Sequence, residues 1–283
     1  MPGIGVDQQP KVTVPHLQHM KAAGDRIAMV TAYDYAFARL AERAGIDVIL
    51  VGDTLGEVIQ GGHTTIPVTL EEMIYHARLV SRACERTLVV GDLPFGSYQV
   101  SPARALESAI RLLKEGGVAA VKLEGGRNVA ASIAAIAAAD VPVMGHIGLT
   151  PQSIHRMGGY RVQGRRHGDA PGDYERLIAD AQAVEEAGAF AVVLEAIPAE
   201  LAAEITWQLC IPTIGVGAGP SCDGQVLVLH DVLGLTERPP RFAKAYAELG
   251  SEAASAIGCF IRDVKEGAFP SLAHSYRATV RRE

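Results

Sequence analysis

Short apolar runs alternate with amphipathic stretches along almost the whole chain. Each run is rich in Val, Ile, Leu or Ala, and most end at glycine or at an ionisable residue, which is typical of buried strands in a parallel sheet. Eight strand-then-helix units with no break in composition predict an α/β fold, a single (β/α)8 TIM barrel over residues 1–283. The expected strands are 27–33, 46–52, 87–90, 118–126, 141–145, 189–194, 211–216 and 226–230.

Capping residues place several of the helices. A short helix at 14–23 precedes the first strand, and residues 1–14 are expected to form a mobile tail. Ser101 and Pro102 are typical of a helix start and Gly116 of a helix end. The helix between them is expected to bury Leu106, Ile110 and Leu113. The last forty residues are also expected to be helical, with a buried side that includes Phe242, Tyr246, Leu249 and Ile257.

The alternative fold is an open doubly wound sheet, whose dinucleotide-binding loop has the pattern G-x-G-x-x-G/A. Gly215, Gly217 and Gly219 give G-x-G-x-G, but Pro220 stands where that loop requires glycine or alanine. The motif also lies late in the chain. These glycines therefore favour a tight loop of the barrel over a cofactor site.

Composition narrows the class of protein. Hydrophobic residues make up 48% of the chain, with 30 Gly but only 6 Phe and one Trp, a profile that suits tight packing of helices on a sheet. The net charge of −6 argues against nucleic acid as a partner. No stretch has the length of a membrane span. A reducing cytoplasm is expected because no C-x-x-C pair occurs among Cys84, Cys210, Cys222 and Cys259.

Ionisable side chains follow the apolar runs on successive strands. In the sequence VAAVKLEGG at 118–126, Lys122 and Glu124 are two residues apart and point to the same face of the expected strand. A single pair of this kind is equally well explained by a salt bridge at the strand end. The carboxyl ends of barrel strands, however, converge on one mouth, where active sites of this fold lie. The residues expected at this mouth are Asp53, Asp92, Lys122, Glu124, His146 and Glu195.

Three carboxylates in one mouth require neutralisation. Two unit charges about 4 Å apart repel by roughly 4 kcal/mol at an effective dielectric near 20, and Lys122 supplies only one positive charge. Oxygen ligands favour Mg²⁺, whereas zinc prefers His or Cys. We therefore assign Asp53, Asp92 and Glu124 to a Mg²⁺ site, directly or through water, which leaves Glu195 free as a base. The alternative is a barrel rim held by salt bridges without metal.

A Mg²⁺ ion with few protein ligands keeps positions open for a bidentate small molecule. An α-keto acid can bind through its carboxylate and keto oxygens. The metal then acts as a Lewis acid and stabilises the enolate formed when a neighbouring C–H proton is removed. Lys122 can add a hydrogen bond to the developing oxyanion.

At these residues the chain resembles the ketopantoate hydroxymethyltransferase family. The resemblance implies a (β/α)8 barrel that transfers a hydroxymethyl group from 5,10-methylenetetrahydrofolate to 3-methyl-2-oxobutanoate. The product is 2-dehydropantoate, and the reaction is the first committed step of pantothenate synthesis. The matching segments cover nearly the whole chain in order: TAYDYAFA (31–38), LVGDTLG (50–56), GDLPFGSY (91–98), VKLEGG (121–126), GHIGLTPQS (145–153), GGYRVQGR (158–165), LEAIP (194–198) and IGVGAGPSCDGQVLVLHD (214–231).

The resemblance also implies roles for individual residues. The metal ligands of the family fall on Asp53 and Asp92, with Glu124 binding the ion or its water, and the proton acceptor falls on Glu195. The keto acid would be bound by Asp53, Thr54, Asp92, Lys122 and His146. Large homo-oligomers, often decamers, are typical of the family, so a decamer is expected.

Two places depart from the family pattern. Thr54 stands where many members have Ser, which preserves the hydroxyl group. The loop at 164–172 carries extra charges at Arg165, Arg166 and His167. One hypothesis is that an arginine of the longer loop at 148–172 meets the glutamyl tail of folate; the alternative is a set of solvated charges. The candidates are Arg156, Arg161, Arg165 and Arg166.

Two other functions stay open. The first is another Mg²⁺-dependent aldolase or lyase of the phosphoenolpyruvate-mutase type that acts on an α-keto acid; turnover that depends on tetrahydrofolate would distinguish it. The second is a non-catalytic barrel that binds a metal and a metabolite as a regulatory module. Such a module would show no exchange of substrate protons.

Overall fold

A closed barrel of parallel strands forms the centre of the first part of the chain. The computed structural model describes residues 10–166 and 173–276. Within them the strands pair in sequence order, and the last pairs with the first. This confirms the predicted (β/α)8 class and excludes the open doubly wound sheet. The strands are β1 (Ile27–Thr31), β2 (Val48–Val51), β3 (Leu88–Asp92), β4 (Ala120–Glu124), β5 (Val143–Gly148), β6 (Ala191–Glu195), β7 (Thr213–Val216) and β8 (Gly224–Leu227).

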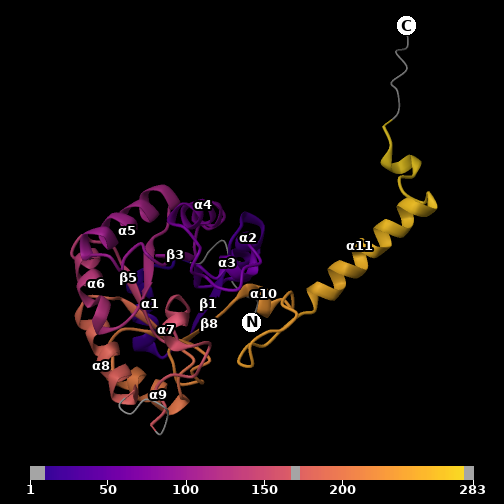
Figure 1. Cartoon of the computed structure of the whole chain (residues 1–283). Helices are drawn as coiled ribbons and strands as arrows, with labels where there is room; N and C mark the ends of the chain where they lie inside the picture. Colours follow the sequence, from indigo (N-terminus) through magenta and orange to yellow (C-terminus); the bar gives the residue numbers. More distant parts are fainter. Residues whose placement is uncertain (1–9, 167–172, 277–283) are drawn as a thin grey trace. The chain divides into compact units, whose positions relative to one another are not determined.

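Helices surround this barrel on its outer side (Figure 1). Within the described residues, helices follow β1 to β6 in the predicted alternation, and short extra helices occur in the loops after β2 and β5. The predicted helix after the seventh strand is absent, because β7 leads directly into β8 through residues 217–223, all of them described. The helices of this part are α1 (Val14–Ala23), α2 (Tyr35–Ala44), α3 (Leu55–Val58), α4 (Leu70–Ser81), α5 (Pro102–Gly116), the 3-10 turn η2 (Arg127–Val129), α6 (Ala130–Ala137), the 3-10 turn η3 (Pro151–Ser153), α7 (Ile154–Met157), α8 (Asp173–Glu186) and α9 (Ala199–Gln208).

The chain divides into two compact units, Met1–Leu229 and His230–Glu283. The first holds the barrel, and α10 (Leu229–Val232) lies at the boundary. The second holds α11 (Leu249–Glu266) and the 3-10 turn η4 (Leu272–His274). A single domain over 1–283 therefore stays a prediction. The side chains predicted to be buried in the second unit are not: Phe242, Tyr246 and Ile257 are exposed, and Leu249 is half-buried.

Part of the segment predicted to be a mobile tail is packed against the barrel. Residues 1–9 lie outside the described residues, but Val12 is buried and its backbone N–H donates to the carbonyl oxygen of Arg86 at 2.8 Å. Leu17 of α1 is fully buried in the same core cluster as Met29 and Val48 of the barrel strands. This packing places α1 against the barrel interior and leaves the carboxyl ends of the strands for a functional site.

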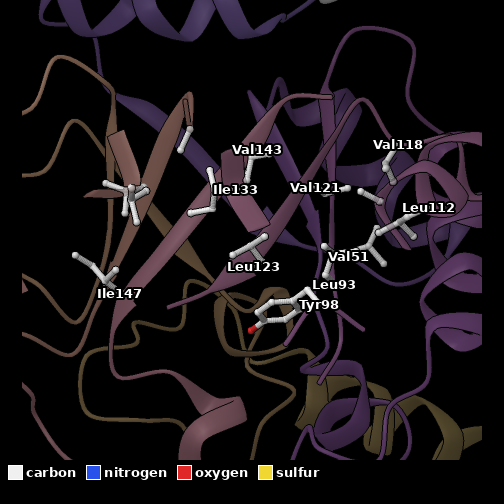
Figure 2. Close-up of a cluster of buried hydrophobic side chains, with 14 of the residues drawn as sticks. Val51, Leu93, Tyr98, Leu112, Val118, Val121, Leu123, Ile133, Val143 and Ile147 are labelled. Carbon is white, nitrogen blue, oxygen red and sulfur yellow. The ribbon is translucent and has the colours of Figure 1, made fainter. Parts of the chain in front are cut away.

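Side chains of the strands that helices cover alternate between two cores. In β2, Val48 and Leu50 belong to the cluster inside the barrel, whereas Ile49 and Val51 belong to the outer cluster between barrel and helices. Figure 2 shows part of the outer cluster, where strand side chains meet those of α5 and α6. Because this alternation continues to the strand ends, it determines which of the terminal residues face the mouth of the barrel.

The helix α5 differs from its prediction in orientation. Gly116 is its last residue, and Gly117 with φ 75° ends it in the left-handed conformation. Ile110, expected to be buried, is 39% exposed, and Leu106 and Leu113 are only partly buried. The fully buried positions lie one residue earlier, at Ala105, Ala109 and Leu112. Small alanines on the inner face allow the helix to approach the sheet closely, and the larger side chains lie at its edges.

The outer faces of β1 and β8 are less covered than those of their neighbours. Ala28 and Gln225 are exposed and Val30 is half-buried, whereas β2 to β5 are buried at every position. Within the described residues of the first unit, no helix stands between β7 and β8, which accounts for this exposure.

Candidate active site

On several strands, the side chains that point into the barrel end in an ionisable group at the carboxyl end of the strand. On β3, Asp92 follows Leu88 and Val90 at intervals of two residues. On β4, Lys122 and Glu124 continue the same series. Because side chains alternate along a strand, these groups extend the barrel interior towards its carboxyl end. The sequence prediction that they share one face is confirmed.

Lys122 and Asp92 form a buried ion pair at this end. Their Nζ and Oδ1 atoms are 2.6 Å apart, and the pairing of β3 with β4 places the two residues directly side by side. Burial raises the pKa of Asp92 despite the nearby ammonium. Burial alone would lower the pKa of Lys122, but the charges of Asp92, Glu124 and Asp53 outweigh it and raise that pKa. The lysine is therefore held as a cation.

Asp53 and Thr54 enter the site from the loop after β2. The backbone N–H of Asp53 donates to Oδ2 of Asp92 at 3.2 Å. Burial, followed by the negative charges of Asp92 and Glu124, raises the pKa of Asp53 well above its ordinary value. Thr54 opens α3, and its Oγ1 lies 2.7 Å from the hydroxyl oxygen of Tyr33. The two acids thus lie close enough to oppose each other's ionisation.

His146 lies between the other two carboxylates. Its Nε2 is 3.1 Å from Oε2 of Glu195, and its Nδ1 is 3.4 Å from Oε1 of Glu124 and 3.2 Å from Nζ of Lys122. The proton on Nδ1 decides whether this atom donates to Glu124 or accepts from Lys122. Burial and the charge of Lys122 oppose a charged ring, but the hydrogen bonds to Glu124 and Glu195 raise the pKa of His146 to about 9.

The backbone holds Glu195 firmly at the end of β6. Ala196, the next residue, has a positive φ of 47°, which is uncommon for a residue other than glycine. Gly148 at the end of β5 has φ 97°, and a Cβ there would collide with the carbonyl oxygen of Glu195. The N–H of Leu149 donates to the same carbonyl at 2.8 Å. Glycine is therefore required where the two strand ends meet beside Glu195.

All seven residues predicted for the site line one cavity of about 80 Å³. Asp53, Thr54, Asp92, Lys122, Glu124, His146 and Glu195 form its polar side. Apolar side chains complete the wall: Leu50, Val193, Val216, Val226, Leu227 and Val228. The cavity can therefore hold a small molecule with a polar end and an apolar end. The role of each residue stays a prediction.

The acidic cluster suits a hard cation by its chemistry. Within residues 10–166 and 173–276, no three His, Cys, Asp or Glu side chains are already arranged to hold a metal ion. Asp92 pairs with Lys122 instead, and Glu124 faces His146. However, Asp53 and Asp92 are buried oxygen donors whose pKa values are raised by burial and by neighbouring acids. A divalent cation would remove that repulsion, so the donor set fits Mg²⁺.

The sequence interpretation missed two buried polar side chains of this site. Tyr33 contacts Thr54, and Gln152 of η3 donates from its Nε2 to Oδ2 of Asp53 at 2.9 Å. Neither carries a charge or a periodic signal that would distinguish it from an ordinary core or loop residue. Both lie within segments that carry the family resemblance, at 31–38 and 145–153, and that resemblance is the signal by which they could have been found.

The arginines of the loop after β5 separate into two groups. Arg156 lines a second cavity of about 100 Å³ that also reaches Glu124 and Gln152. Arg165 and Arg166 line a third one, where Arg166 stacks on the ring of Tyr174 at 4.3 Å. Residues 167–172, including His167, lie outside the described residues. Contact with a folate tail stays a hypothesis for all of them.

Comparison with solved structures shows the fold. Oxaloacetate acetylhydrolase in complex with 3,3-difluorooxalacetate has a TM-score of 0.60 at 15% identity, with 95% of this chain and 92% of that chain covered. Phosphonopyruvate hydrolase in complex with oxalate and Mg²⁺ has a TM-score of 0.58 at 15% identity and covers 92% of each chain. At this identity the likeness concerns the barrel architecture alone.

Sequence comparison shows the family. A family model described as ketopantoate hydroxymethyltransferase matches residues 11–272. The 3-methyl-2-oxobutanoate hydroxymethyltransferase of Geotalea daltonii is 59% identical over 265 residues, which are 93% of this chain and 98% of the relative. That of Pelobacter propionicus is 55% identical over 95% of this chain and 99% of the relative. With such matches over nearly the whole length and a barrel mouth that gathers the predicted acids, the chain belongs to the ketopantoate hydroxymethyltransferase family.

Proposed function

We propose that this chain transfers a hydroxymethyl group from 5,10-methylenetetrahydrofolate to 3-methyl-2-oxobutanoate, in the first committed step of pantothenate synthesis. The observation that carries this proposal is the cavity in which a charged wall faces an apolar wall at the carboxyl ends of the strands. With Mg²⁺ bound to its acids, the charged wall would suit the carboxylate and keto oxygens of the substrate. The apolar wall suits its isopropyl group, which carries the reacting carbon.

Asp53 and Asp92 would hold Mg²⁺ directly, and Glu124 would bind it directly or through water. When bound, the ion supplies Lewis acidity, which draws electron density from the keto oxygen. Lys122 would donate a hydrogen bond to the keto oxygen. Its ammonium group lies against Asp92, so it is next to the place where the ion and the keto oxygen would meet. Thr54 offers a hydroxyl that shares a hydrogen bond with the hydroxyl of Tyr33.

Glu195 would accept the proton from C3 of the keto acid. Its carboxylate takes the proton while the electron pair of the broken C–H bond moves to the C2–C3 bond. His146 holds Oε2 of Glu195 at 3.1 Å and so orients the carboxylate. The other acids of the cluster are engaged with Lys122 or Gln152 and would hold the ion, which supports Glu195 as the base. Water would hydrolyse the methylene group of the folate donor to formaldehyde and tetrahydrofolate, with both C–N bonds of the methylene broken. The C3 carbanion equivalent would add to the carbonyl carbon of that formaldehyde, and the resulting alkoxide would take the proton back from Glu195 to give the hydroxymethyl group.

The proposal is tested by proton exchange without the folate donor. Wild-type enzyme with keto acid and Mg²⁺ should exchange the C3 proton with D₂O. Glu195→Gln keeps the size of the side chain but removes its basicity, so exchange should fall by about 10² to 10⁴ while the keto acid still binds. NMR measures the exchange and calorimetry the binding, and Glu186→Gln on the exposed side of α8 is the matched control. Exchange at the wild-type rate in Glu195→Gln would move the base elsewhere, with His146 as the next candidate.

An α-keto-acid lyase of the phosphoenolpyruvate-mutase type is the alternative reaction on this fold. It is favoured only by the architecture shared with phosphonopyruvate hydrolase. Such an enzyme would turn over its substrate without tetrahydrofolate. Product formation that requires 5,10-methylenetetrahydrofolate therefore excludes it.

We also propose that copies of this chain associate, with the ten subunits that the family resemblance implies as the expected number. Two exposed surfaces support association: the outer face of β1 and β8, and an apolar side of α11 that includes Ile257, Ile261 and Val264. No described helix is long and apolar enough to cross a membrane. We place the reaction in the cytoplasm, where the free thiols of Cys84, Cys210, Cys222 and Cys259 would stay reduced.

A further inference from the structure

Gln152 is a neutral side chain at the centre of the acidic cluster and is only 4% exposed. Its Nε2 donates to Oδ2 of Asp53 at 2.9 Å and to the carbonyl oxygen of Leu93 at 3.0 Å. Its Oε1 accepts from the hydroxyl of Tyr98 at 2.8 Å and from Nε2 of Gln99 at 3.1 Å. Both donor and both acceptor positions of the amide are used, so its orientation is determined.

The backbone of Gln152 holds a second acid of the cluster. Its N–H donates to Oε2 of Glu124 at 3.0 Å. Tyr98 reinforces this link, because its hydroxyl oxygen also accepts the backbone N–H of Glu124 at 3.1 Å. One residue from the loop after β5 therefore contacts Asp53 from the loop after β2 and Glu124 at the end of β4.

We propose that Gln152 is a positioning residue that restricts the rotation of Asp53 and Glu124 and so favours their binding of Mg²⁺; this inference rests on the proposed function. Neither carboxylate can rotate without losing a buried hydrogen bond. Outer groups that orient metal ligands in this way typically contribute 10- to 100-fold in metal affinity. Gln152 would therefore set the affinity of the site without touching the ion.

An amide suits this position better than a charged group. A lysine or arginine would donate to Asp53 but would also neutralise the cluster and compete with the cation. A glutamate would place a carboxylate oxygen where Nε2 now lies, 2.9 Å from Oδ2 of Asp53. The amide supplies the hydrogen bond and leaves the negative charge of the acids available for Mg²⁺.

The test compares Gln152→Glu and Gln152→Leu with wild type and with the control Gln182→Leu, an exposed glutamine of α8. Gln152→Glu can still accept from Tyr98 and Gln99 but cannot donate to Asp53 when ionised. Mg²⁺ affinity is measured by calorimetry, kcat and KM by turnover, and folding by circular dichroism and Tm without Mg²⁺. We expect both Gln152 variants to bind Mg²⁺ about 10- to 100-fold more weakly, with kcat reduced. Gln182→Leu should match wild type.

A purely structural role would lower Tm and leave the Mg²⁺ affinity of the folded variants unchanged. Affinity within twofold of wild type in both Gln152 variants would overturn the proposal. Tighter binding in Gln152→Glu would also overturn it, because added negative charge would then matter more than orientation. So would a wild type that binds no Mg²⁺. A wild type that binds Mg²⁺ but does not turn over the two substrates refutes the proposed reaction, and the variant affinities still decide the role of Gln152.

Discussion

At the residue scale, the buried ion pair of Lys122 and Asp92 contributes both to the stability of the fold and to the proposed reaction. Both are buried, and Nζ lies 2.6 Å from Oδ1. Removing one partner of a buried pair leaves the other charge uncompensated, which typically costs about 3–5 kcal/mol. Here Glu124 and Asp53 also stabilise the ammonium, so the lower end of that range is expected.

We therefore predict that Asp92→Asn lowers the free energy of unfolding by about 3 kcal/mol and abolishes Mg²⁺-dependent turnover. Chemical denaturation without Mg²⁺ measures the first effect, and an assay at saturating keto acid the second. The double variant Asp92→Asn/Lys122→Met separates the loss of stability from the loss of turnover, because it removes both charges of the buried pair. Its stability should recover in part while activity stays absent. Unchanged stability and turnover in Asp92→Asn would contradict both roles.

At the level of elements, Glu42 of α2 ties its helix to the segment before β3. It is 6% exposed, and its carboxylate accepts the backbone N–H groups of Glu85, Arg86 and Thr87 at 2.8–3.1 Å. Burial alone would raise the pKa of Glu42, but the hydrogen bonds from Thr87, Arg86 and Glu85 outweigh it and lower that pKa. The ionised carboxylate thus stabilises the fold.

Glu42→Gln should lower the free energy of unfolding by about 2 kcal/mol at neutral pH, because hydrogen bonds to a charged acceptor are replaced. The folded pKa lies below the unfolded one, so this contribution is complete above the unfolded value. It is lost as pH falls through the folded value. The difference between wild type and variant should therefore shrink when denaturation is repeated in acid.

The matched control for Glu42 is Glu85→Gln. The side chain of Glu85 is exposed and pairs only loosely with Arg39 at 3.7 Å, and such a surface pair contributes about 0–1 kcal/mol. Its backbone N–H still donates to Glu42. A pH-independent loss in Glu42→Gln, or an equal loss in Glu85→Gln, would contradict the role assigned to the Glu42 carboxylate.

For the whole molecule, the exposed apolar side of α11 is the feature that needs explanation. Isolated helices are only marginally stable in water, and most helical stability comes from packing of an apolar face. In α11, Ile257 is 59% exposed, and Ile261 and Val264 lie on the same side at helical spacing. A second copy of the chain is the occupant we propose for this side.

We predict that Ile257→Asp reduces the number of associated copies and that Ser255→Asp does not. The first variant places a charge within the apolar side. Ser255 precedes Ile257 by two positions in the sequence and therefore lies on the opposite side of the helix. Light scattering after gel filtration measures the mass of the assembly. Wild-type protein that elutes as a monomer at micromolar concentration would contradict association.

The sequence by itself determined the barrel and the residues at its mouth. Eight apolar runs, most of them followed by a helix, specify the architecture, because such runs are typical of strands buried in a parallel sheet. The period of two then decides which terminal residues point inward, so the sequence pattern alone assigns Asp92, Lys122, Glu124, His146 and Glu195 to one cavity. Both signals are local, and local periodicity can be read directly from a sequence.

Only the tertiary structure decided which of these groups pair. Lys122 pairs with Asp92 on the neighbouring strand instead of with Glu124 on its own strand, because the register of β3 against β4 sets the distance. Gln152 reaches Asp53, which is 99 residues away in the chain, and no pattern in the sequence indicates that contact. The inner face of α5 was displaced by one residue for the same reason. Periodicity describes the faces of one element, whereas partners depend on how different elements meet in space.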